Sequence, residues 1–175
     1  MKSNISQLAK RAKSGDARAF GEIYSLFSAE MYRYALYSLG SEPAAQDAVQ
    51  DAALEAWKNI GKLKDEEAAK AWFFKILNRC CKHSLREKYR ADFTDLDSVS
   101  QLSSEDASGQ IQLGIDLLRL METLTKEEKD IVLLSAVSGL NSREIAKTIG
   151  LPAATVRSKL SRALAKLRTK EEMKK

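Results

Sequence analysis

Apolar residues recur along this chain at every third or fourth position, which is the spacing that gives a helix one buried face. Ile5, Leu8, Ala9 and Ala12 mark a first short helix. A second helix is expected to follow Asp16, which can cap its N-terminus, and to end at Gly40. Its first apolar positions are Ala19, Phe20, Ile23, Tyr24 and Phe27.

Two more helices are expected before residue 91. Ser41 can cap the first, Pro43 is tolerated in its first turn, and the helix ends near Gly61. Its apolar face consists of Ala45, Ala48, Val49, Ala52, Ala53, Ala56 and Trp57. After the polar segment 62–67, a long helix reaches about Arg90. Its buried stripe is predicted to contain Trp72, Phe73, Ile76, Leu77, Cys80 and Leu85.

Periodicity is lost in residues 92–110 and returns after them. Ile111, Ile115, Leu118 and Met121 form one apolar stripe. Thr125 and Glu128 have the spacing of a capping box, and Gly139 closes the helix that follows. The apolar positions of that helix are Ile131, Val132, Leu134 and Ala136. No segment alternates with a period of two, so the predicted fold class is all-α.

The most specific local pattern covers residues 141–168. Asn141 with Glu144 can cap a short helix over residues 142–149, Gly150 supplies a left-handed turn, and a second helix starts near Ala153. Two short helices around such a turn are the plan of a helix-turn-helix. The small core is expected to contain Leu140, Ile145, Ile149, Leu151, Val156 and Leu160. The polar side chains left outside are Thr155, Arg157, Ser158, Lys159, Ser161 and Arg162.

In this motif the second helix enters the DNA major groove, where arginine can recognise guanine and Ser or Thr can contact bases or phosphates. We therefore expect Arg157, Ser158, Ser161 and Arg162 to face the groove. Lys159 and Lys166 are expected to contact the backbone. The alternative for this segment is a helical hairpin with a solvated charged face. The acid-free second helix favours the DNA-binding interpretation.

Charge is distributed in three blocks, although the formal net charge is +5. Residues 1–90 carry +5, residues 91–110 carry −5, and residues 111–175 carry +5 again. Residues 70–90 hold seven Lys or Arg against one acid, and residues 153–170 hold six and no acid. Basic clusters of this kind attract polyanions such as nucleic acids, although each alone could be a solvated helix face.

Aromatic residues divide the chain at the same place. All 12 Phe, Tyr and Trp residues lie at or before Phe93. Two different side-chain compositions indicate two separate cores. We therefore expect two small helical domains, residues 1–91 and 111–175, joined by a flexible acidic linker over residues 92–110, with the helix-turn-helix in the second domain.

Several classes of function lack support. Cys80 and Cys81 are adjacent, which fits neither a CxxC motif nor a disulfide framework, and His83 is the only histidine. Residue patterns for zinc hydrolysis, nucleotide binding or a serine nucleophile do not occur. No catalytic site, metal or cofactor is expected. The longest uncharged stretch has 12 residues and the first residues lack an apolar run, so we expect a cytoplasmic protein with no membrane insertion.

Four segments resemble one family. One segment is similar to the promoter-binding C-terminal domain of extracytoplasmic-function (ECF) sigma factors: LNSREIAKTIGLPAATVRSKLSRALAKLR. Another is similar to the opening GD-x-x-AF segment of the same family: SGDARAFGEIYSLF. A third segment, AAQDAVQDAALEAW, resembles the family's helix AEDLVQEVFLEAW. The fourth, WFFKILNRCCKHSLREKYR, resembles the family's helix WL-x-x-IA-x-N-x-x-x-D-x-x-R, with Trp72, Asn78 and Arg86 taken as matching. The usual Asp falls at Lys82, or at His83 one residue on.

The resemblance implies a non-enzymatic factor that binds core RNA polymerase, directs it to promoters and helps open them. The C-terminal helix-turn-helix would read the −35 element and contact the polymerase flap. The N-terminal domain would recognise the −10 element. Its implied DNA contacts are Lys64, Asp65, Lys75, Asn78, Arg79, Lys82 and Arg86. Trp72 and Phe73 could stack on bases, but their helical spacing favours core packing.

The resemblance also implies protein partners. The helix over residues 44–60 would dock on the polymerase clamp coiled coil through Asp47, Gln50, Asp51 and Glu55. The acidic linker would thread through basic polymerase channels. An anti-sigma factor is a further implied partner. The alternatives are a one-component or response-type regulator, which would need a sensing domain, an adaptor that sequesters a partner, and, least supported, an enzyme.

Overall fold

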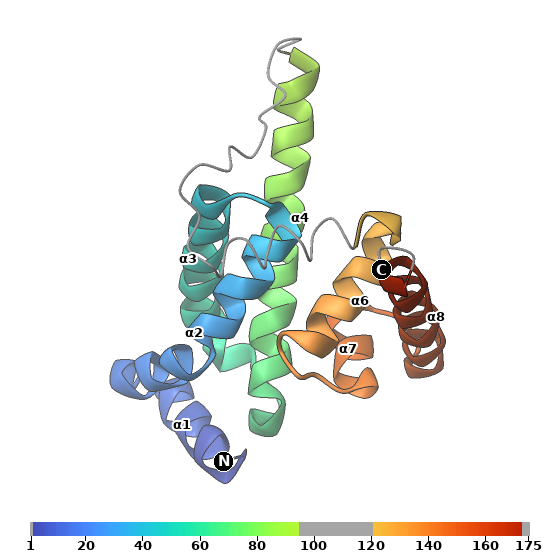
Figure 1. Ribbon diagram of the computed structural model, residues 1–175. Coiled ribbons are helices and arrows are strands. Elements are labelled where there is room, and N and C mark those ends of the chain that lie inside the picture. Colours follow the sequence, from blue (N-terminus) through green and yellow to red (C-terminus); the bar gives the residue numbers. More distant parts are fainter. Residues whose placement is uncertain (1, 95–120, 173–175) are drawn as a thin grey trace.

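The computed structural model describes residues 2–94 and 121–172, and all regular structure within these ranges is helical, as predicted. The N-terminal part contains α1 (Lys2–Lys13), α2 (Ala17–Leu39), α3 (Glu42–Asn59) and α4 (Ala69–Thr94) (Figure 1). The C-terminal part contains α6 (Lys126–Ala136), α7 (Ser142–Ile149) and α8 (Ala153–Glu172). The expected linker beyond residue 94 and the stripe of Ile111, Ile115 and Leu118 lie outside the described residues.

The predicted helix caps of the N-terminal part are confirmed. The Asp16 carboxylate accepts hydrogen bonds from the backbone N–H groups of Arg18 and Ala19, each at 3.0 Å. Ser41 caps α3, and Gly40 takes the left-handed conformation with φ of 63° after α2. Because Gly lacks a Cβ, it adopts this conformation without the steric cost that other residues would meet. These signals fix where α2 ends and α3 begins.

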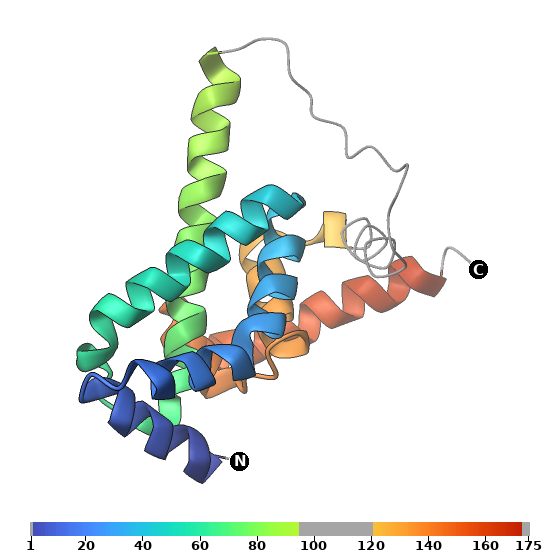
Figure 2. The same ribbon diagram turned by 90° about the vertical axis from the view of Figure 1, so that its left-hand side faces the viewer.

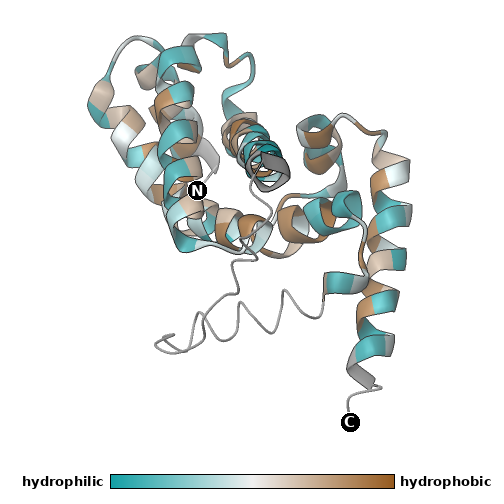
Figure 3. Ribbon diagram, turned by 90° about the horizontal axis from the view of Figure 1, so that it is seen from above, coloured by the Kyte–Doolittle hydropathy of each residue, from teal (hydrophilic) through white to brown (hydrophobic). Residues whose placement is uncertain are grey.

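Helices α2, α3 and α4 pack around an aromatic core. Ile23, Tyr34, Phe73 and Phe74 are fully buried. The Phe27 and Phe73 rings meet edge to face with centroids 5.7 Å apart. In Figure 3 the apolar ribbon segments of the helices turn toward one another, and polar segments turn outward. Burial of large aromatic side chains is the main stabilising contribution to a small domain such as this.

Helix α4 lies between the two helical groups. It packs against α2 and α3 on one side and against α7 on another, and the two views in Figures 1 and 2 agree on this placement. Its buried set is therefore wider than one stripe. Phe74 and Cys81 are buried in addition to the predicted stripe, of which Trp72, Cys80 and Leu85 are half-buried against the core. A single apolar face cannot describe a helix that is covered from two directions.

The same effect occurs in α6. Ile131, Val132, Leu133 and Leu134 are all buried, although the sequence pattern omitted Leu133. Ala136, which the pattern placed inside, is exposed. Leu133 is buried because it faces Tyr37 and other residues of the N-terminal part across the boundary between the two groups. Among the described residues, no helix has both the length and the apolar character needed to cross a membrane.

Candidate nucleic-acid interface

The predicted helix-turn-helix is present with its predicted bounds. The Asn141 side chain accepts hydrogen bonds from the N–H groups of Arg143 and Glu144, at 2.9 and 3.1 Å. The Glu144 carboxylate accepts one from the Asn141 N–H at 2.8 Å, which completes the capping box. Gly150 then turns the chain with φ of 77°. The capping box fixes the start of α7 and Gly150 fixes its end, and α8 begins three residues after Gly150.

Helix α8 is held by one apolar edge. Val156 and Ala163 are fully buried, and Leu160 and Leu167 are partly buried against the same core. This edge packs on α6 and α7, so the opposite face of α8 turns to solvent. Arg157, Ser158, Ser161 and Arg162 lie on that exposed face, and Thr155 is half-buried beside it. The residues predicted to meet base edges therefore share one accessible surface.

The α8 surface is stiffened by local hydrogen bonds. Ser158 Oγ donates to the Thr155 carbonyl at 3.0 Å, and Arg162 Nε donates to the Ser158 carbonyl at 3.3 Å. The remaining guanidinium N–H groups of Arg162 can still form the two-pronged contact that guanine accepts.

The two lysines expected on the DNA backbone are engaged within the domain. Lys159 Nζ lies 2.7 Å from a carboxylate oxygen of Glu127, and Lys166 Nζ lies 2.8 and 2.9 Å from the two oxygens of Glu128. The hydrogen bond from Lys166, followed by the backbone N–H of Thr125, lowers the pKa of Glu128. Phosphate contact by either lysine therefore competes with an existing carboxylate partner, which the sequence alone did not indicate.

In the N-terminal part, the basic residues of α4 divide by exposure. Lys75, Arg79 and Arg86 are exposed, and Lys64 is exposed in the loop before the helix. Asp65 accepts a hydrogen bond from the Glu67 N–H at 3.0 Å and so caps the short turn Glu66–Ala68. Arg79 also pairs with Glu55 of α3. These accessible residues form the α4 basic surface: Lys64, Asp65, Lys75, Arg79 and Arg86.

Asn78 does not belong to this surface. It is buried, and its amide donates a hydrogen bond to the Tyr34 hydroxyl at 2.6 Å. Counted from Trp72, the Asn of the quoted family pattern falls on the exposed Arg79, one residue after Asn78, so the match to Asn78 was out of register. Phe73 is fully buried, as core packing requires, and Trp72 is half-buried against it.

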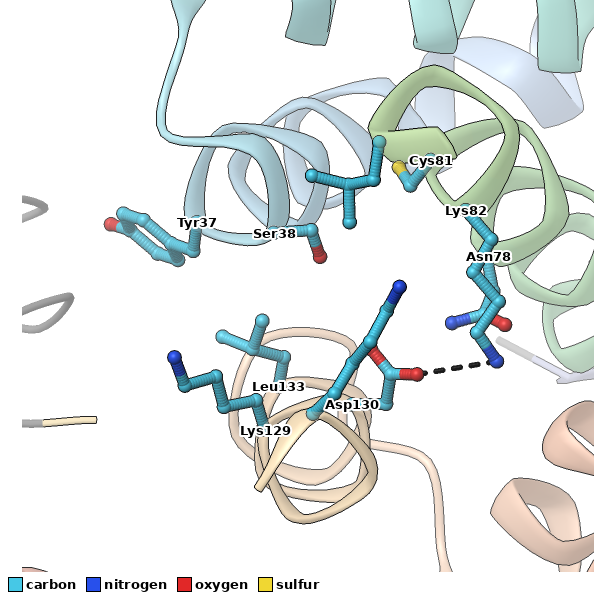
Figure 4. Close-up of a pocket in the computed structure, with 10 residues that line it drawn as sticks. Tyr37, Ser38, Asn78, Cys81, Lys82, Lys129, Asp130 and Leu133 are labelled. Atoms are coloured by element: carbon cyan, nitrogen blue, oxygen red, sulfur yellow. Dashed lines mark ion pairs between the residues drawn. The ribbon is translucent and has the colours of Figure 1, made fainter. Parts of the chain in front are cut away.

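Lys82 lies at the boundary between the two helical groups. Its Nζ is 3.3 Å from a carboxylate oxygen of Asp130 in α6, across a small cavity of about 40 Å³ (Figure 4). Asn78, Cys81 and Ser38 line the same cavity. Burial raises the pKa of the Cys81 thiol to about 12, with further contributions from Cys80 and Asp130. This thiol is therefore protonated and unreactive near neutral pH.

A second surface lies on α3. Asp47, Gln50 and Asp51 are exposed on one face, as predicted, and Glu55 is half-buried beside Arg79. Leu54 lies on the same face with 52% of its surface exposed, and sequence analysis did not single it out. A single exposed leucine is common on protein surfaces, so Leu54 alone does not mark this face as a binding site.

The fold and these surfaces define a class: a two-part helical protein with a helix-turn-helix at its C-terminal end and a second basic helix surface. Two family models match it. Sigma-70 region 2 matches residues 23–91, and sigma-70, region 4 matches residues 115–167. The chain belongs to the ECF family of RNA polymerase sigma factors. Its function is to direct promoter-specific transcription initiation by RNA polymerase.

Relatives of known name span the chain. The ECF RNA polymerase sigma factor SigM of Mycobacterium tuberculosis is 26% identical over 166 residues, covering 95% of this chain and 83% of the relative. The RNA polymerase sigma factor CnrH of Cupriavidus metallidurans is 27% identical over 177 residues, covering 91% and 90%. SigW of Bacillus subtilis is 23% identical over 181 residues, covering 96% and 97%.

Solved structures share the fold. CnrH in complex with the cytosolic domain of CnrY matches with a TM-score of 0.78 at 22% identity, over 98% of this chain and 99% of that chain. The sigma factor RpoE in complex with the anti-sigma factor NepR from Bartonella quintana matches with a TM-score of 0.71 at 23% identity, over 87% and 96%. The predicted arrangement of two helical domains is confirmed by these likenesses.

Proposed function

We propose that α8 reads the −35 element of promoter DNA and that the α4 basic surface recognises the −10 element. The observation that carries the first assignment is the exposed face of α8, which holds no acidic residue over residues 153–170 and lies at the end of a helix-turn-helix. An α-helix of this shape fits the major groove, where base pairs present distinct donors and acceptors.

The residues of α8 have two different roles in this proposal. Arg157 and Arg162 contact base edges, because their guanidinium groups are exposed and can pair with guanine O6 and N7. Ser158, Ser161 and Thr155 add contacts to bases or phosphates. Lys159 and Lys166 contact phosphates, and each must exchange a carboxylate partner for a phosphate when DNA binds. Their contribution is therefore smaller than that of an unpaired lysine.

The test uses the holoenzyme reconstituted from core polymerase and this chain. Run-off transcription on fragmented genomic DNA first locates the start sites and, by alignment, the −35 element. Arg157→Ala should then weaken binding by about 1–3 kcal/mol on the matched element and relax specificity at one position. Lys159→Ala is the matched control and should weaken all sequences alike. Equal losses for Arg157→Ala on matched and scrambled −35 sequences would show that Arg157 reads no base.

The −10 assignment rests on the α4 basic surface. Lys75, Arg79 and Arg86 follow one another along one helix and can track a single-strand backbone, with Lys64 and Asp65 in the preceding loop. Asp65 can accept a hydrogen bond from an exposed cytosine amino group. Lys82 belongs to this set only when it is released from Asp130, and Asn78 only when the helix core is disturbed.

The polymerase-facing surface is the exposed face of α3. Asp47, Gln50 and Asp51 supply acidic and amide groups for a basic partner helix, and Leu54 supplies an apolar anchor at the centre of that face. Glu55 takes part through its pair with Arg79. The proposed partner is the clamp coiled coil of core RNA polymerase, while the C-terminal domain contacts the flap.

The remaining assignments follow from the family. We assign residues 1–91 to the core-binding and −10 domain, residues 92–110 to an acidic linker, and residues 111–175 to the −35 domain. The protein acts in the cytoplasm, where polymerase and DNA are found, and performs no catalytic step itself. Because CnrH and RpoE are each described in a complex, the latter with an anti-sigma factor, we propose an anti-sigma factor as a partner here.

A further inference from the structure

The connection between α3 and α4 carries Lys64 and Asp65 at an exposed tip. Leu63, directly before the tip, is buried. After the tip comes the short turn Glu66–Ala68, and Ala69 at the start of α4 is fully buried. Two of the residues proposed to contact the −10 element therefore stand between two fixed points of the chain.

Helix α1 holds this connection from the side. Lys13, in the last turn of α1, has its Nζ 2.7 Å from Glu66 Oε1. The two side chains are only 28% and 21% exposed, so solvent and salt screen this ion pair less than a fully exposed pair. The hydrogen bond from Lys13 lowers the pKa of Glu66, so the carboxylate is ionised near neutral pH. Helix α1 also packs against the short helical turns on both sides of the tip, Ile60–Lys62 and Glu66–Ala68.

Helix α1 is itself fixed to the N-terminal domain. Its inner face is buried, and consists of Leu8, Ala9 and Ala12. Near its end, Arg11 Nη2 lies 2.7 Å from Asp16 Oδ2, and Asp16 is also the residue that caps α2. Because α1 is anchored by apolar packing and by this second ion pair, Lys13 reaches the connection from a rigid support.

We propose that Lys13 is a positioning residue for −10 recognition: through its ion pair with Glu66 it holds Lys64 and Asp65 in the conformation that meets the DNA strand. The role of the tip as a −10 contact rests on the proposed function. Lys13 acts through Glu66 and does not itself need to touch DNA. A tip that is already ordered loses less conformational entropy when DNA binds, so the correct base is bound more tightly.

Loss of the ion pair should affect matched promoters more than mismatched ones. Only molecules whose tip is in the competent conformation gain from the correct base, so the affinity for a matched −10 element falls with that fraction. A promoter with the wrong base gains nothing from the tip and depends little on the pair. The ratio of matched to mismatched transcription therefore falls. The limit is about fivefold, the largest factor by which such partly exposed pairs shift an equilibrium.

The first measurement follows the connection alone, by NMR hydrogen exchange on the full-length free protein. The reporters are the N–H groups of Glu67 and Ala68, which donate to Asp65 Oδ1 at 3.0 Å and to the Asp65 carbonyl at 3.1 Å. Glu66→Gln and Lys13→Gln should each speed their exchange by about two- to fivefold. Lys13→Arg keeps the positive charge and should exchange at the wild-type rate.

Arg11→Gln is the matched control. It removes one positive charge from the same helix two residues away, and it breaks the pair with Asp16 while leaving Lys13 and Glu66 unchanged. A general effect of charge on the helix would appear in Arg11→Gln and Lys13→Gln alike. Release of the connection should appear only in the variants that break the pair between Lys13 and Glu66.

The second measurement is run-off transcription by the reconstituted holoenzyme. Its templates are a promoter with the mapped −10 element and versions of that promoter with one −10 base replaced. The matched-to-mismatched ratio should fall by about two- to fivefold for Glu66→Gln and Lys13→Gln, and should keep its wild-type value for Lys13→Arg and Arg11→Gln. Because one holoenzyme preparation transcribes both templates, a loss of folded protein or of polymerase binding cancels in the ratio.

Lys64→Ala distinguishes the positioning role from the −10 role of the tip, because it removes a tip side chain and leaves the ion pair in place. If Lys64→Ala lowers the ratio while Glu66→Gln speeds exchange without lowering it, the tip reads the −10 element and the positioning proposal is overturned. If neither variant lowers the ratio, the −10 assignment of the tip has failed. Wild-type exchange in Glu66→Gln would overturn the positioning proposal whatever transcription shows.

Discussion

The hydrogen bond between Asn78 and Tyr34 gives a sharp test of whether Asn78 is structural. Tyr34 is fully buried and Asn78 is 5% exposed, so both partners are shielded from bulk solvent. Tyr34→Phe removes only the hydroxyl and leaves the Asn78 amide without this acceptor, while Asn78→Ala leaves the hydroxyl without this donor. An unsatisfied buried polar group costs about 1–3 kcal/mol, so we expect either change to lower the free energy of unfolding by about 2 kcal/mol.

The assay is urea unfolding followed by tryptophan fluorescence. Both tryptophans, Trp57 and Trp72, lie in the N-terminal part, so the signal reports on the core that contains the hydrogen bond. For a slope of about 1.5 kcal/mol per molar urea, a loss of 2 kcal/mol lowers the unfolding midpoint by about 1.3 M. The double variant should lose less than the two single losses added together, because the second change removes a group that is already unpaired.

The contrary result is equally plain. If Asn78→Ala keeps the wild-type urea midpoint but the holoenzyme loses transcription from −10-dependent promoters, Asn78 contacts DNA. Its hydrogen bond to Tyr34 would then add nothing to stability. Additive losses in the double variant, within about 0.5 kcal/mol, would mean that the two side chains do not interact.

Two further predictions concern ionisable groups. The pKa of Glu128 is lowered from 4.5 by Lys166 and by the capping box, so its contribution to stability is present above pH 4.5 and is lost as the pH falls through the lowered folded-state pKa. Circular dichroism of acid unfolding should therefore show a shallower pH dependence in Glu128→Gln than in the wild type. The pKa of Cys81 is raised to about 12, and Cys80 is half-buried with a pKa raised less, so a thiol reagent at pH 8 should modify Cys80 first and Cys81 only on unfolding. Equal rates for the two thiols in the native protein would contradict the described burial.

Local signals made much of the fold predictable. The caps at Asp16, Ser41, Thr125 and Asn141 act between residues two or three positions apart, so the sequence states them directly. The bounds of α7 and the start of α8 followed from the same kind of signal. The exposure of Arg157 and Arg162 was predictable because helical spacing places them opposite a complete apolar edge.

The errors came from tertiary contacts that periodicity does not encode. Leu133 is buried because a second domain covers a helix that already has one buried face, and the pattern had selected Ala136 instead. The family resemblance placed Asn78 among the −10 contacts, but in the structure its side chain is buried against Tyr34, which lies 44 residues earlier in the chain.

On the candidate surfaces too, local signals were predictable and tertiary contacts were not. Whether a lysine on α8 is available to DNA depends on where α6 presents its carboxylates, and neither helix alone gives that geometry. Leu54 was missed for a different reason. A pattern of polar neighbours marks a helix face as solvated, and a single leucine within it does not change that reading until its exposure is known.

The burial of Leu133 against the N-terminal part has a thermal consequence. Leu133 and Leu85 line the same boundary from opposite domains, so separating the domains transfers both side chains toward water. Hydration of apolar surface raises the heat capacity, by about 0.45 cal/mol/K for each Å² exposed. The enthalpy of domain separation therefore depends on temperature. Because apolar burial weakens on cooling, the hydrophobic part of this boundary holds the domains less firmly in the cold.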